Sequence, residues 1–471
     1  MAKHPTQHAG HSANPAVDNT QPVAVSQPQF GEVKATPDPT RFFVKHASDT
    51  AAYAILDKLP HQPPLPFPKP AGGDEPILRL QDTMGAAGAG VIDNILKHGQ
   101  IVFHAVGDTG NTRSTHPQSL VADKMASDYV ESNVANVPAF FYHLGDVVYS
   151  FGESEYYYDQ FYDPYRDYPA PILAIAGNHD GMVAPGKTVP TLQAFLENFC
   201  ALGAPHKTPE AGELPRTAMI QPGVYFTLEA PFVRILGLYS NRLENPGIIS
   251  SEGDPKSPLK DWQLDFLNAA LERVKTEAFS GALIIAVHHP PYTSGGKHPG
   301  SPRMLKDIDD ACKKAGVWPH AVLSAHAHNY QRFTRILNPG SPDEMHVPYI
   351  VAGNGGHGIT QLVHVGGTTL RTPVREQAQE KADKSDQVVF ENYDDRDYGY
   401  LRIVADNKQL RIEYHPQADG TTTKTPDDFV TVDLASHQLV HYSPIGTRGK
   451  SKAAARPAKA KQPSAGERKK R

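Results

Sequence analysis

Five short polar motifs follow short apolar runs in this chain, and each contributes side chains that can bind a metal ion. In chain order they are GDTG (107–110), GDVVY (145–149), GNHD (177–180), VHHPPY (287–292) and AHAH (325–328). They supply carboxylates, a phenol, an amide and imidazoles but no thiolate, and this ligand set favours iron, zinc or manganese. One carboxylate can bridge two cations roughly 3.5 to 4 Å apart, as in two-metal hydrolytic sites. We expect Asp146 to occupy that central place.

Each motif also has an ordinary structural interpretation when it is taken alone. Asp108 could cap a helix, Asn178 could hold a left-handed turn, and His288 could be a core histidine. The AHAH motif could be a strand with alternating faces. Independent accidents would have to fall on five successive strand ends, so the motifs together indicate a single shared site.

The elements that would position these motifs are short apolar, β-branched runs that alternate with helical patterns. Strands are predicted at 101–107, 139–145, 171–177, 282–288 and 321–326. Helices are predicted near 118–134, 154–163, 190–200, 261–276 and 303–315. This order is typical of parallel βαβ units, in which ligands bind beyond the carboxyl ends of the strands. The motifs would therefore meet at one edge of a sheet.

Further along the chain the pattern changes to antiparallel strands joined by turns. These strands are predicted at 332–337, 347–353, 398–407, 409–416 and 428–434. A polar segment near 366–395 is interpreted as a surface insertion. The predicted fold class is therefore α/β, with two packed mixed β-sheets flanked by helices.

The two ends of the chain differ in composition from its middle. Residues 1–76 hold 13 of the 42 prolines, including the run PPLPFPKP. We therefore expect residues 1–95 to be a Pro-rich, largely extended or disordered extension. Residues 448–471 contain ten Lys or Arg against one acid, Glu467. This composition predicts a disordered basic tail over 441–471, which serves either solubility or weak contact with anionic surfaces.

Cysteine usage and hydropathy bear on the compartment. The two cysteines, Cys200 and Cys312, form no close sequence pair, so a disulfide framework is excluded. The N-terminus shows no apolar leader, and the strongly apolar run ALIIAV is too short to span a bilayer. We expect a cytoplasmic protein with no membrane span, and an exported form stays open.

In this order, the motifs resemble the signature of the calcineurin-like metallophosphoesterases, and among them the purple acid phosphatases. That signature runs DxG, GDxxY, GNH followed by Asp or Glu, VxxH, and GHxH. The resemblance covers roughly residues 100–360 and implies a four-layer α/β/β/α sandwich, to which we assign residues 96–440. It also implies a binuclear hydrolase that cleaves phosphate monoesters, in small molecules or phosphoproteins, by attack of a metal-held hydroxide.

The resemblance assigns the metal ligands position by position. One metal would be held by Asp108, Asp146, Tyr149 and His328, and the other by Asp146, Asn178, His288 and His326. We prefer His288 to His289 because the stretch from Ile285 to His288 has the VxxH spacing. His289 would then lie behind the ligands.

The phenol of Tyr149 distinguishes the two metals. In related phosphoesterases without this tyrosine, the first motif usually reads DxH, and Gly110 stands here in place of that His. A phenolate oxygen stabilises a trivalent ion, whereas the amide of Asn178 adds no charge and suits a divalent one. The resemblance thus implies Fe(III) in the Tyr149 site beside Fe(II), Zn(II) or Mn(II) in the Asn178 site.

Further residues are candidates for catalysis and substrate contact. His179 matches the family's non-ligand histidine, so the resemblance implies a general acid or leaving-group stabiliser, with Asp180 orienting its ring. The candidates for contact with the substrate, or for support of such contacts, are Arg113, His289, His298, Arg332 and His357.

Two features depart from the family pattern. Ala325 stands where GHxH has Gly, which requires an ordinary φ angle at that residue. Purple acid phosphatases are usually exported, whereas no leader is visible here. A reducing cytoplasm would hold the second iron as Fe(II) or favour manganese or zinc, so the identity of the second metal stays open. The alternatives to a monoesterase are a metal-dependent phosphodiesterase and, from another class, a non-catalytic binding protein that uses its basic tail.

Overall fold

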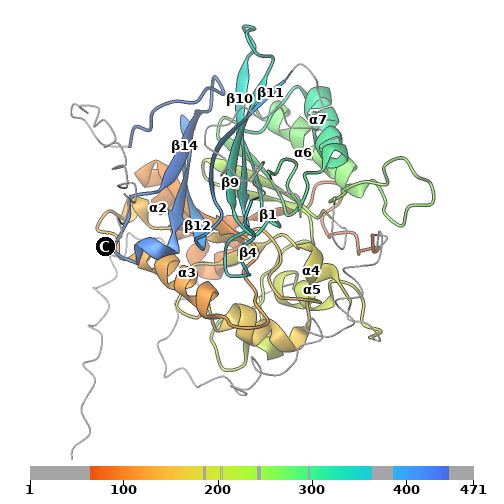
Figure 1. Ribbon diagram of the computed structural model, residues 1–471, viewed down its shortest axis with the longest axis vertical. Helices are drawn as coiled ribbons and strands as arrows, with labels where there is room; N and C mark the ends of the chain where they lie inside the picture. The colour runs from red at the N-terminus through yellow and green to blue at the C-terminus, as the bar shows by residue number, and fades with distance from the viewer. Residues whose placement is uncertain are drawn as a thin grey trace, which may run out of the picture.

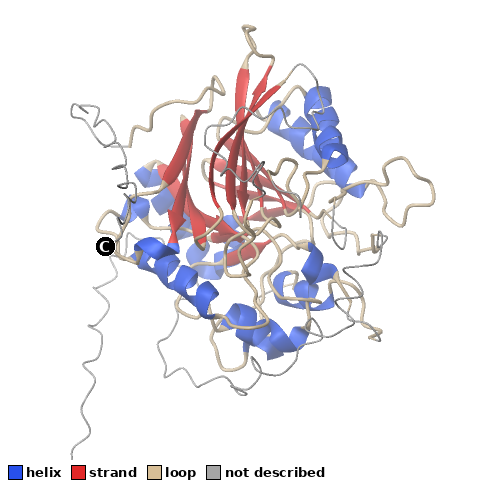
Figure 2. Cartoon of the chain, viewed as in Figure 1, coloured by secondary structure: helices blue, strands red, loops and turns tan. Residues whose placement is uncertain are grey.

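The computed structural model describes residues 64–183, 187–201, 203, 205–240, 246–294, 298–362 and 386–444. Within these ranges the chain forms two β-sheets with helices around them (Figures 1 and 2). The first 63 residues and the basic tail from residue 445 onward lie outside the described residues. So does the larger part of the polar segment at 366–395.

The larger sheet has eight strands in the order β1-β5-β6-β7-β8-β10-β9-β11. Its strands are β1 (Ile77–Arg79), β5 (Phe226–Ala230), β6 (Val233–Leu238), β7 (Ala282–Val287), β8 (Ala321–Ser324), β9 (Tyr330–Leu337), β10 (Met345–Ala352) and β11 (Gln387–Asp394). The smaller sheet has six strands in the order β14-β13-β12-β2-β3-β4. Its strands are β2 (Gln100–Val106), β3 (Phe141–His143), β4 (Ile172–Ala174), β12 (Gly399–Asp406), β13 (Gln409–Pro416) and β14 (Asp428–Asp433).

Both sheets are mixed, and each has a parallel part that carries polar motifs. In the smaller sheet β2, β3 and β4 run parallel, while β12, β13 and β14 add antiparallel strands. In the larger sheet β6, β7, β8 and β10 run parallel, and β9 is antiparallel to both β10 and β11. The predicted α/β class with two mixed sheets flanked by helices is confirmed.

The helices lie on the outside of the sheets (Figure 2). They are η2 (Leu80–Ala87), α2 (Gly88–His98), α3 (His116–Ala126), η3 (Ser127–Tyr129), η4 (Val134–Asn136), η5 (Ser154–Tyr156), η6 (Tyr158–Tyr162), α4 (Asn178–Gly181), α5 (Gln193–Phe199), η7 (Pro209–Ala211), α6 (Trp262–Thr276), α7 (Pro302–Ala315) and η9 (Gln417–Asp419). The helices α6 and α7 pack together beside the larger sheet, and α3 lies beside β12 of the smaller one (Figure 1).

Local sequence explains why these elements form where they do. Every residue of β7 is buried, so its sequence is a continuous apolar run rather than an alternating one. Helix α7 starts with Pro302, whose missing N–H costs nothing in the first turn. It ends at Gly316, which has φ of 68° and donates its N–H to the carbonyl of Cys312.

Two sequence-based expectations about the fold are wrong in part. The segment expected to be extended up to residue 95 folds from residue 77: β1 pairs with β5, and Val91 and Ile95 of α2 are buried in the core. The expected surface insertion is also wrong over Gln387–Asp394, which forms β11 and pairs with β9. Both strands were missed because their apolar patterns are weak. Strand β1 has only three residues, and most side chains of β11 are half-buried, many of them polar.

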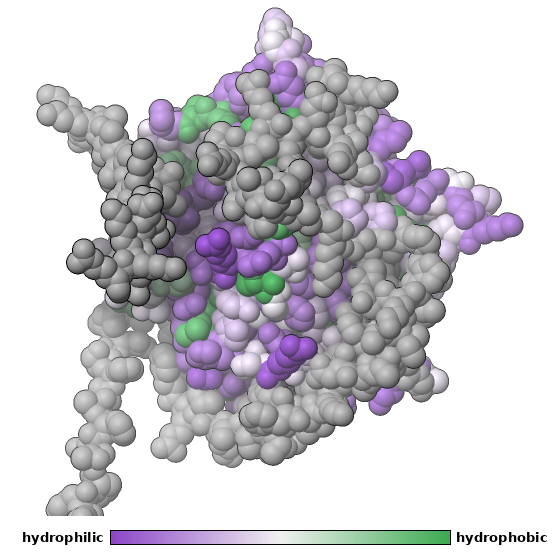
Figure 3. All heavy atoms as spheres, viewed as in Figure 1, coloured by the Kyte–Doolittle hydropathy of each residue, from purple (hydrophilic) through white to green (hydrophobic). Residues whose placement is uncertain are grey.

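The described helices include none that is both long and apolar enough to cross a membrane. The face in Figure 3 is mostly hydrophilic, with small separate hydrophobic spots. The large hydrophobic side chains exposed among the described residues are Leu96, Val130, Val189, Phe429 and Val440. They belong to different elements and loops.

A buried ion pair fastens α7 to the larger sheet. Arg335 of β9 donates to both carboxylate oxygens of Asp309, at 2.7 and 2.6 Å, and also to Asp386 at 2.8 Å. The side chains of Arg335 and Asp309 are each 1% exposed. By contrast, the next residue, Asp310, is exposed and pairs only with Lys306 one turn earlier.

These neighbouring aspartates give a matched test of burial. We expect Asp309→Ala to lower the free energy of unfolding by about 3 kcal/mol, because it leaves part of a buried guanidinium without its partner. Asp310→Ala removes an exposed pair and should cost under about 0.5 kcal/mol. Urea denaturation followed by circular dichroism measures both, and equal losses for the two variants would contradict the role of the buried pair.

Candidate metal centre

The strand ends of both sheets converge at one place. Asp108 and Asp146 follow β2 and β3, and Asn178 opens α4 after β4 of the same sheet. His288 follows β7, and His326 and His328 follow β8 of the larger sheet. All six of these side chains and that of Tyr149 are buried. The site therefore lies where the carboxyl ends of the two parallel regions meet.

One group of contacts surrounds the phenol of Tyr149. Its Oη donates to Oδ1 of Asp108 and to Oδ2 of Asp146, each at 2.9 Å. The Nε2 atom of His328 lies 3.3 Å from the same oxygen and 3.5 Å from Oδ1 of Asp108. Four side chains from three separate stretches of the sequence thus place oxygen or nitrogen donors around one point.

A second group shares Asp146 with the first. Nε2 of His288 lies 3.3 Å from Oδ2 of Asp146 and 3.1 Å from Oδ1 of Asn178. Asp146, His288 and His326 offer ligand atoms that all lie within 4.8 Å of one another. Asp146 therefore contacts both groups.

The backbone at this site is unusual. Asp108, Asp146, His326 and His328 have φ of 53°, 54°, 66° and 49°, in the left-handed region that residues with a Cβ rarely adopt. Such conformations cost roughly 1 to 2 kcal/mol per residue. Hydrogen bonds hold the strained turns: the N–H of His326 donates to Oδ2 of Asp108 at 2.6 Å, and that of His179 to Oδ1 of Asp146 at 2.9 Å. Strain of this kind gathers at functional sites.

Glycines allow the turns to approach closely. A Cβ on Gly177 would lie 2.1 Å from Oδ1 of Asp146, and one on Gly107 would lie 2.6 Å from the Cβ of Ala325. Ala325 itself has no positive φ, so the alanine in place of the family's glycine is accommodated without backbone strain. The bare glycine at 107 leaves room for its methyl group.

The buried ionisable groups of the site shift one another's pKa values. Burial and the neighbouring Asp146 raise the pKa of Asp108 well above its usual value. Burial opposes ionisation of Asp146 as well, but the charges of His288 and His179 hold its pKa well below the usual value. Burial acts to lower the pKa of His288, yet Asp146 raises it to about 9.

The pKa values of His326 and His328, which follow β8, shift in the opposite direction to that of His288. Burial and the surrounding histidines hold the pKa values of His326 and His328 well below the usual value, so both are neutral and suited to coordination. Two carboxylates and a phenol thus face neutral imidazoles, with His288 as the principal source of positive charge. This donor set fits metal ions, whose charge would balance the buried carboxylates.

Comparison with known proteins agrees with this geometry. Residues 102–330 match the family model described as calcineurin-like phosphoesterase, and the match spans all five motifs. The chain carries a calcineurin-like phosphoesterase domain. A search of curated protein sequences found no match.

Solved structures with a similar course of the chain are distant. GAP50 of Plasmodium, the anchor in the inner membrane complex, is 14% identical, with 68% of this chain and 86% of GAP50 covered and a TM-score of 0.42. PhoD is 12% identical, with 74% and 73% covered and a TM-score of 0.43. A 5'-nucleotidase of Staphylococcus aureus is also 12% identical, with 70% and 56% covered and a TM-score of 0.34.

Within the phosphoesterase domain, His179 lies beside Asp146 and Tyr149. Asp180 does not orient its ring. The Nδ1–H of His179 donates to the carbonyl of Ser150 at 2.8 Å. The Asp180 carboxylate instead accepts the backbone N–H groups of Val147 and Gly177, at 3.0 and 2.8 Å, and that of Val148. Because these bonds tie together the turns after β3 and β4, the prediction that Asp180 orients the His179 ring is wrong.

The candidates for substrate contact fall into separate groups. The imidazole of His357 stacks on the ring of Tyr149 at 3.8 Å, and His298 has its Nδ1 3.3 Å from Nε2 of His326. His289 packs against His326, with ring centroids 4.0 Å apart, and its Nδ1 lies 2.8 Å from the hydroxyl of Ser240.

The two arginines are the remaining candidates. Arg113 is exposed on the loop after β2, and its backbone N–H donates to Asn111. The prediction of substrate contact is wrong for Arg332, because its guanidinium donates to both oxygens of Asp428 on β14, at 2.8 and 3.0 Å. This ion pair joins the two sheets.

Sequence reasoning missed the groups that fix Tyr149 and His288 by hydrogen bonds. The amide of Gln160 accepts the N–H of Tyr149 and donates to its carbonyl, both at 2.9 Å. The carbonyl of Leu144 accepts from Nδ1 of His288 at 2.8 Å, which directs Nε2 toward Asp146. The hydrogen bonds of a backbone carbonyl cannot be predicted from residue types. Gln160 belongs to no motif, because it lies in a short helix 11 residues after the tyrosine.

The close packing at Gly177 gives a testable consequence. Its φ of −94° suits any residue, so Gly177→Ala acts only through the clash of the new methyl group with Asp146. We expect loss of most of the bound metal and a stability loss of about 1 to 3 kcal/mol. Inductively coupled plasma mass spectrometry and urea denaturation measure these effects.

Gly90→Ala in α2 serves as the control, since nothing lies within 4 Å of the added Cβ. This variant should keep its metal and gain up to about 1 kcal/mol in stability. A Gly177→Ala protein with full metal content would contradict the packing that we describe.

Proposed function

We propose that this phosphoesterase domain is a binuclear metal-dependent hydrolase that cleaves phosphate monoesters. The observation that carries the proposal is the pair of donor groups that share Asp146, one around Tyr149 and one around His288. Two donor groups that share one carboxylate are the arrangement that a two-metal hydrolytic site requires. The substrate would be a phosphate ester of a small molecule or of a phosphoprotein.

The residues that would hold the metals follow from the two groups. Fe(III) would be held by Asp108, Asp146, Tyr149 and His328, and Fe(II), Zn(II) or Mn(II) by Asp146, Asn178, His288 and His326. The phenol supports the trivalent assignment, because its oxygen can give up a proton and bring a negative charge beside the two carboxylates. When bound, the two cations supply positive charge for the phosphoryl oxygens and lower the pKa of the attacking water.

His179 is the residue of this chain that would move a proton. Its Nδ1 donates to the carbonyl of Ser150, so a proton that leaves the ring toward substrate leaves from Nε2. The ring lies 4.3 Å from that of Tyr149, beside the proposed trivalent site. In this mechanism the His179 imidazolium gives its proton to the oxygen of the departing alcohol, which otherwise leaves as an unstable alkoxide.

Other residues hold these groups in place. The His357 ring stacks on the Tyr149 ring, and the Gln160 amide makes two hydrogen bonds to the backbone of the same tyrosine. Asp180 fixes the turns that carry Asp146 and Asn178. Such support lets the donors keep one geometry while the substrate changes charge.

Metal analysis with a comparison of two esters tests the proposal directly. The full-length protein should contain two metal ions per chain and should hydrolyse p-nitrophenyl phosphate faster than bis(p-nitrophenyl) phosphate. If iron occupies the Tyr149 site, a visible charge-transfer band should be present and should disappear in Tyr149→Phe. Faster cleavage of the diester would favour a phosphodiesterase, and metal-free protein without hydrolysis would favour a binding protein.

His179→Gln separates catalysis from metal binding. This variant should lose about 100- to 10,000-fold in kcat, the usual contribution of a general acid, while keeping both metals. His206→Gln, at an exposed position, is the matched control and should leave kcat unchanged. Steady-state kinetics and elemental analysis give the two readouts, and loss of metal from His179→Gln would make this residue structural instead.

A further inference from the structure

Three aromatic rings from separate parts of the chain stack at the candidate metal centre. The ring of His357 lies nearly parallel to that of Tyr149, with centroids 3.8 Å apart and an angle of 14° between the planes. The ring of His179 lies 4.3 Å from the same phenol ring, at an angle of 38°. At these distances and angles each imidazole lies over a face of the phenol ring, because edge-to-face pairs are steeper and have their centroids farther apart.

The two imidazoles lie on opposite faces of the Tyr149 ring. Carbon atoms in contact are about 3.5 to 4 Å apart. One face of a phenol ring therefore has no room for two imidazole rings whose centroids both lie within 4.3 Å of its own. Tyr149 is the middle ring of this three-ring stack, and its oxygen is the one that donates to Asp108 and Asp146.

The first ring of the stack is fixed to the turn that follows β2. The backbone N–H of His357 donates to the carbonyl of Asp108 at 2.8 Å, and its Nδ1–H donates to the carbonyl of Gly110 at 3.0 Å. The preceding residue packs directly on the same turn, since a Cβ on Gly356 would lie 2.4 Å from the carbonyl oxygen of Thr109. The His357 ring is thus held at its backbone and at one edge.

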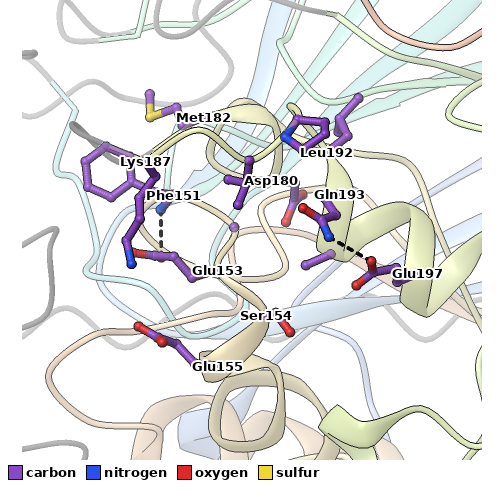
Figure 4. A pocket seen from close by; sticks show the side chains of 14 residues that line it. Phe151, Glu153, Ser154, Glu155, Asp180, Met182, Lys187, Leu192, Gln193 and Glu197 are labelled. Atoms are coloured by element: carbon purple, nitrogen blue, oxygen red, sulfur yellow. Dashed lines mark hydrogen bonds between the residues drawn. The ribbon is translucent and has the colours of Figure 1, made fainter.

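The last ring of the stack is held at one edge by a different segment. The Nδ1–H of His179 donates to the carbonyl of Ser150 at 2.8 Å. The residues after Ser150 form part of the wall of a cavity beside α4, where the N–H of Phe151 donates to Glu153 (Figure 4). A hydrogen bond at one edge lets an imidazole tilt about that edge. Contact with the face of the Tyr149 ring limits this tilt.

Burial shows which ring of the stack is outermost. Tyr149 is 1% exposed and His179 is 6% exposed, whereas His357 is half-buried. His357 therefore closes the stack on the side of the solvent. Without its ring, the phenol ring would lose the contact on one face and would be free to tip away from His179.

We propose that His357 is a positioning residue, which holds the Tyr149 ring against His179 and so directs Nε2 of His179 toward the leaving group. The proposal rests on the phosphomonoesterase function given above and gives His357 a role in it other than contact with the substrate. The loop after β10 thereby contributes to protonation of the departing alcohol through the phenol ring.

Two esters that differ by one nitro group test this role in the metal-loaded full-length protein. Phenolate is more basic than p-nitrophenolate, so phenyl phosphate depends more on a proton from the general acid than p-nitrophenyl phosphate does. The informative quantity is the ratio of kcat/KM for p-nitrophenyl phosphate to kcat/KM for phenyl phosphate, because it does not depend on the amount of active enzyme. We expect His357→Ala to raise this ratio roughly tenfold, since a displaced catalytic group acts poorly. His357→Phe keeps a ring on the phenol face and should restore most of the original ratio.

The stack also has a readout that needs no turnover. The ring protons of His179 lie over the phenol ring, whose ring current shifts their NMR signals. In the metal-free full-length protein with labelled histidines, we expect His357→Ala to move the His179 signal and His357→Phe to bring it back. The His179→Gln variant identifies this signal by its loss.

His116→Ala, at an exposed position at the start of α3, is the control and should change neither readout. Both readouts have to change together in His357→Ala. A shifted His179 signal with an unchanged ester ratio, or a changed ratio with an unshifted signal, would overturn the positioning role. Equal losses for the two esters would overturn it as well, since they indicate contact with the phosphoryl group that both share. If the unaltered protein hydrolyses neither ester, the proposed function fails and the positioning role falls with it.

Discussion

Two buried carboxylates that share one phenol are the constraint on which the site depends. Asp108 and Asp146 both accept from Oη of Tyr149, and both are fully buried. Neighbouring negative charges in a low-dielectric interior repel each other strongly unless protons or cations balance them. The opposite pKa shifts of the two aspartates express that conflict. Binding of metal ions would resolve it, and the surrounding imidazoles are arranged to accept such ions.

The fold meets this constraint with strained backbone at the strand ends. Four site residues have positive φ, and Gly177 lies so close to Asp146 that a methyl group would not fit. The sharp turns direct side chains from strands of two different sheets toward one point. Burial of the core offsets the strain energy of these turns, since every residue of β2 and β7 is buried. The rigid sheets therefore hold a geometry that isolated loops would not keep.

Much of this arrangement can be predicted from the sequence, since buried parallel strands are continuous apolar runs and polar motifs directly follow them. The elements that were missed have weaker patterns: β1 has three residues, and β11 has half-buried polar side chains. Single side chains were harder to place. Arg332 pairs with Asp428, almost 100 residues away, and Asp180 binds backbone N–H groups, which residue types do not reveal. The cavity beside α4 depends on how two loops pack, and no motif marks it.

The donors of the site come from opposite ends of the domain, and this has a consequence for how the chain matures. The hydrogen bond from His326 to Asp108 joins residues 218 positions apart, and Tyr149 meets His328 across 179 positions. On a ribosome that releases residues in order, Asp108, Asp146 and Tyr149 emerge well before the histidines that follow β8. Stable capture of metal therefore requires synthesis to continue past β8, so that His326 and His328 are present. A nascent chain stalled before that strand would carry Asp108, Asp146 and Tyr149 without His326 and His328.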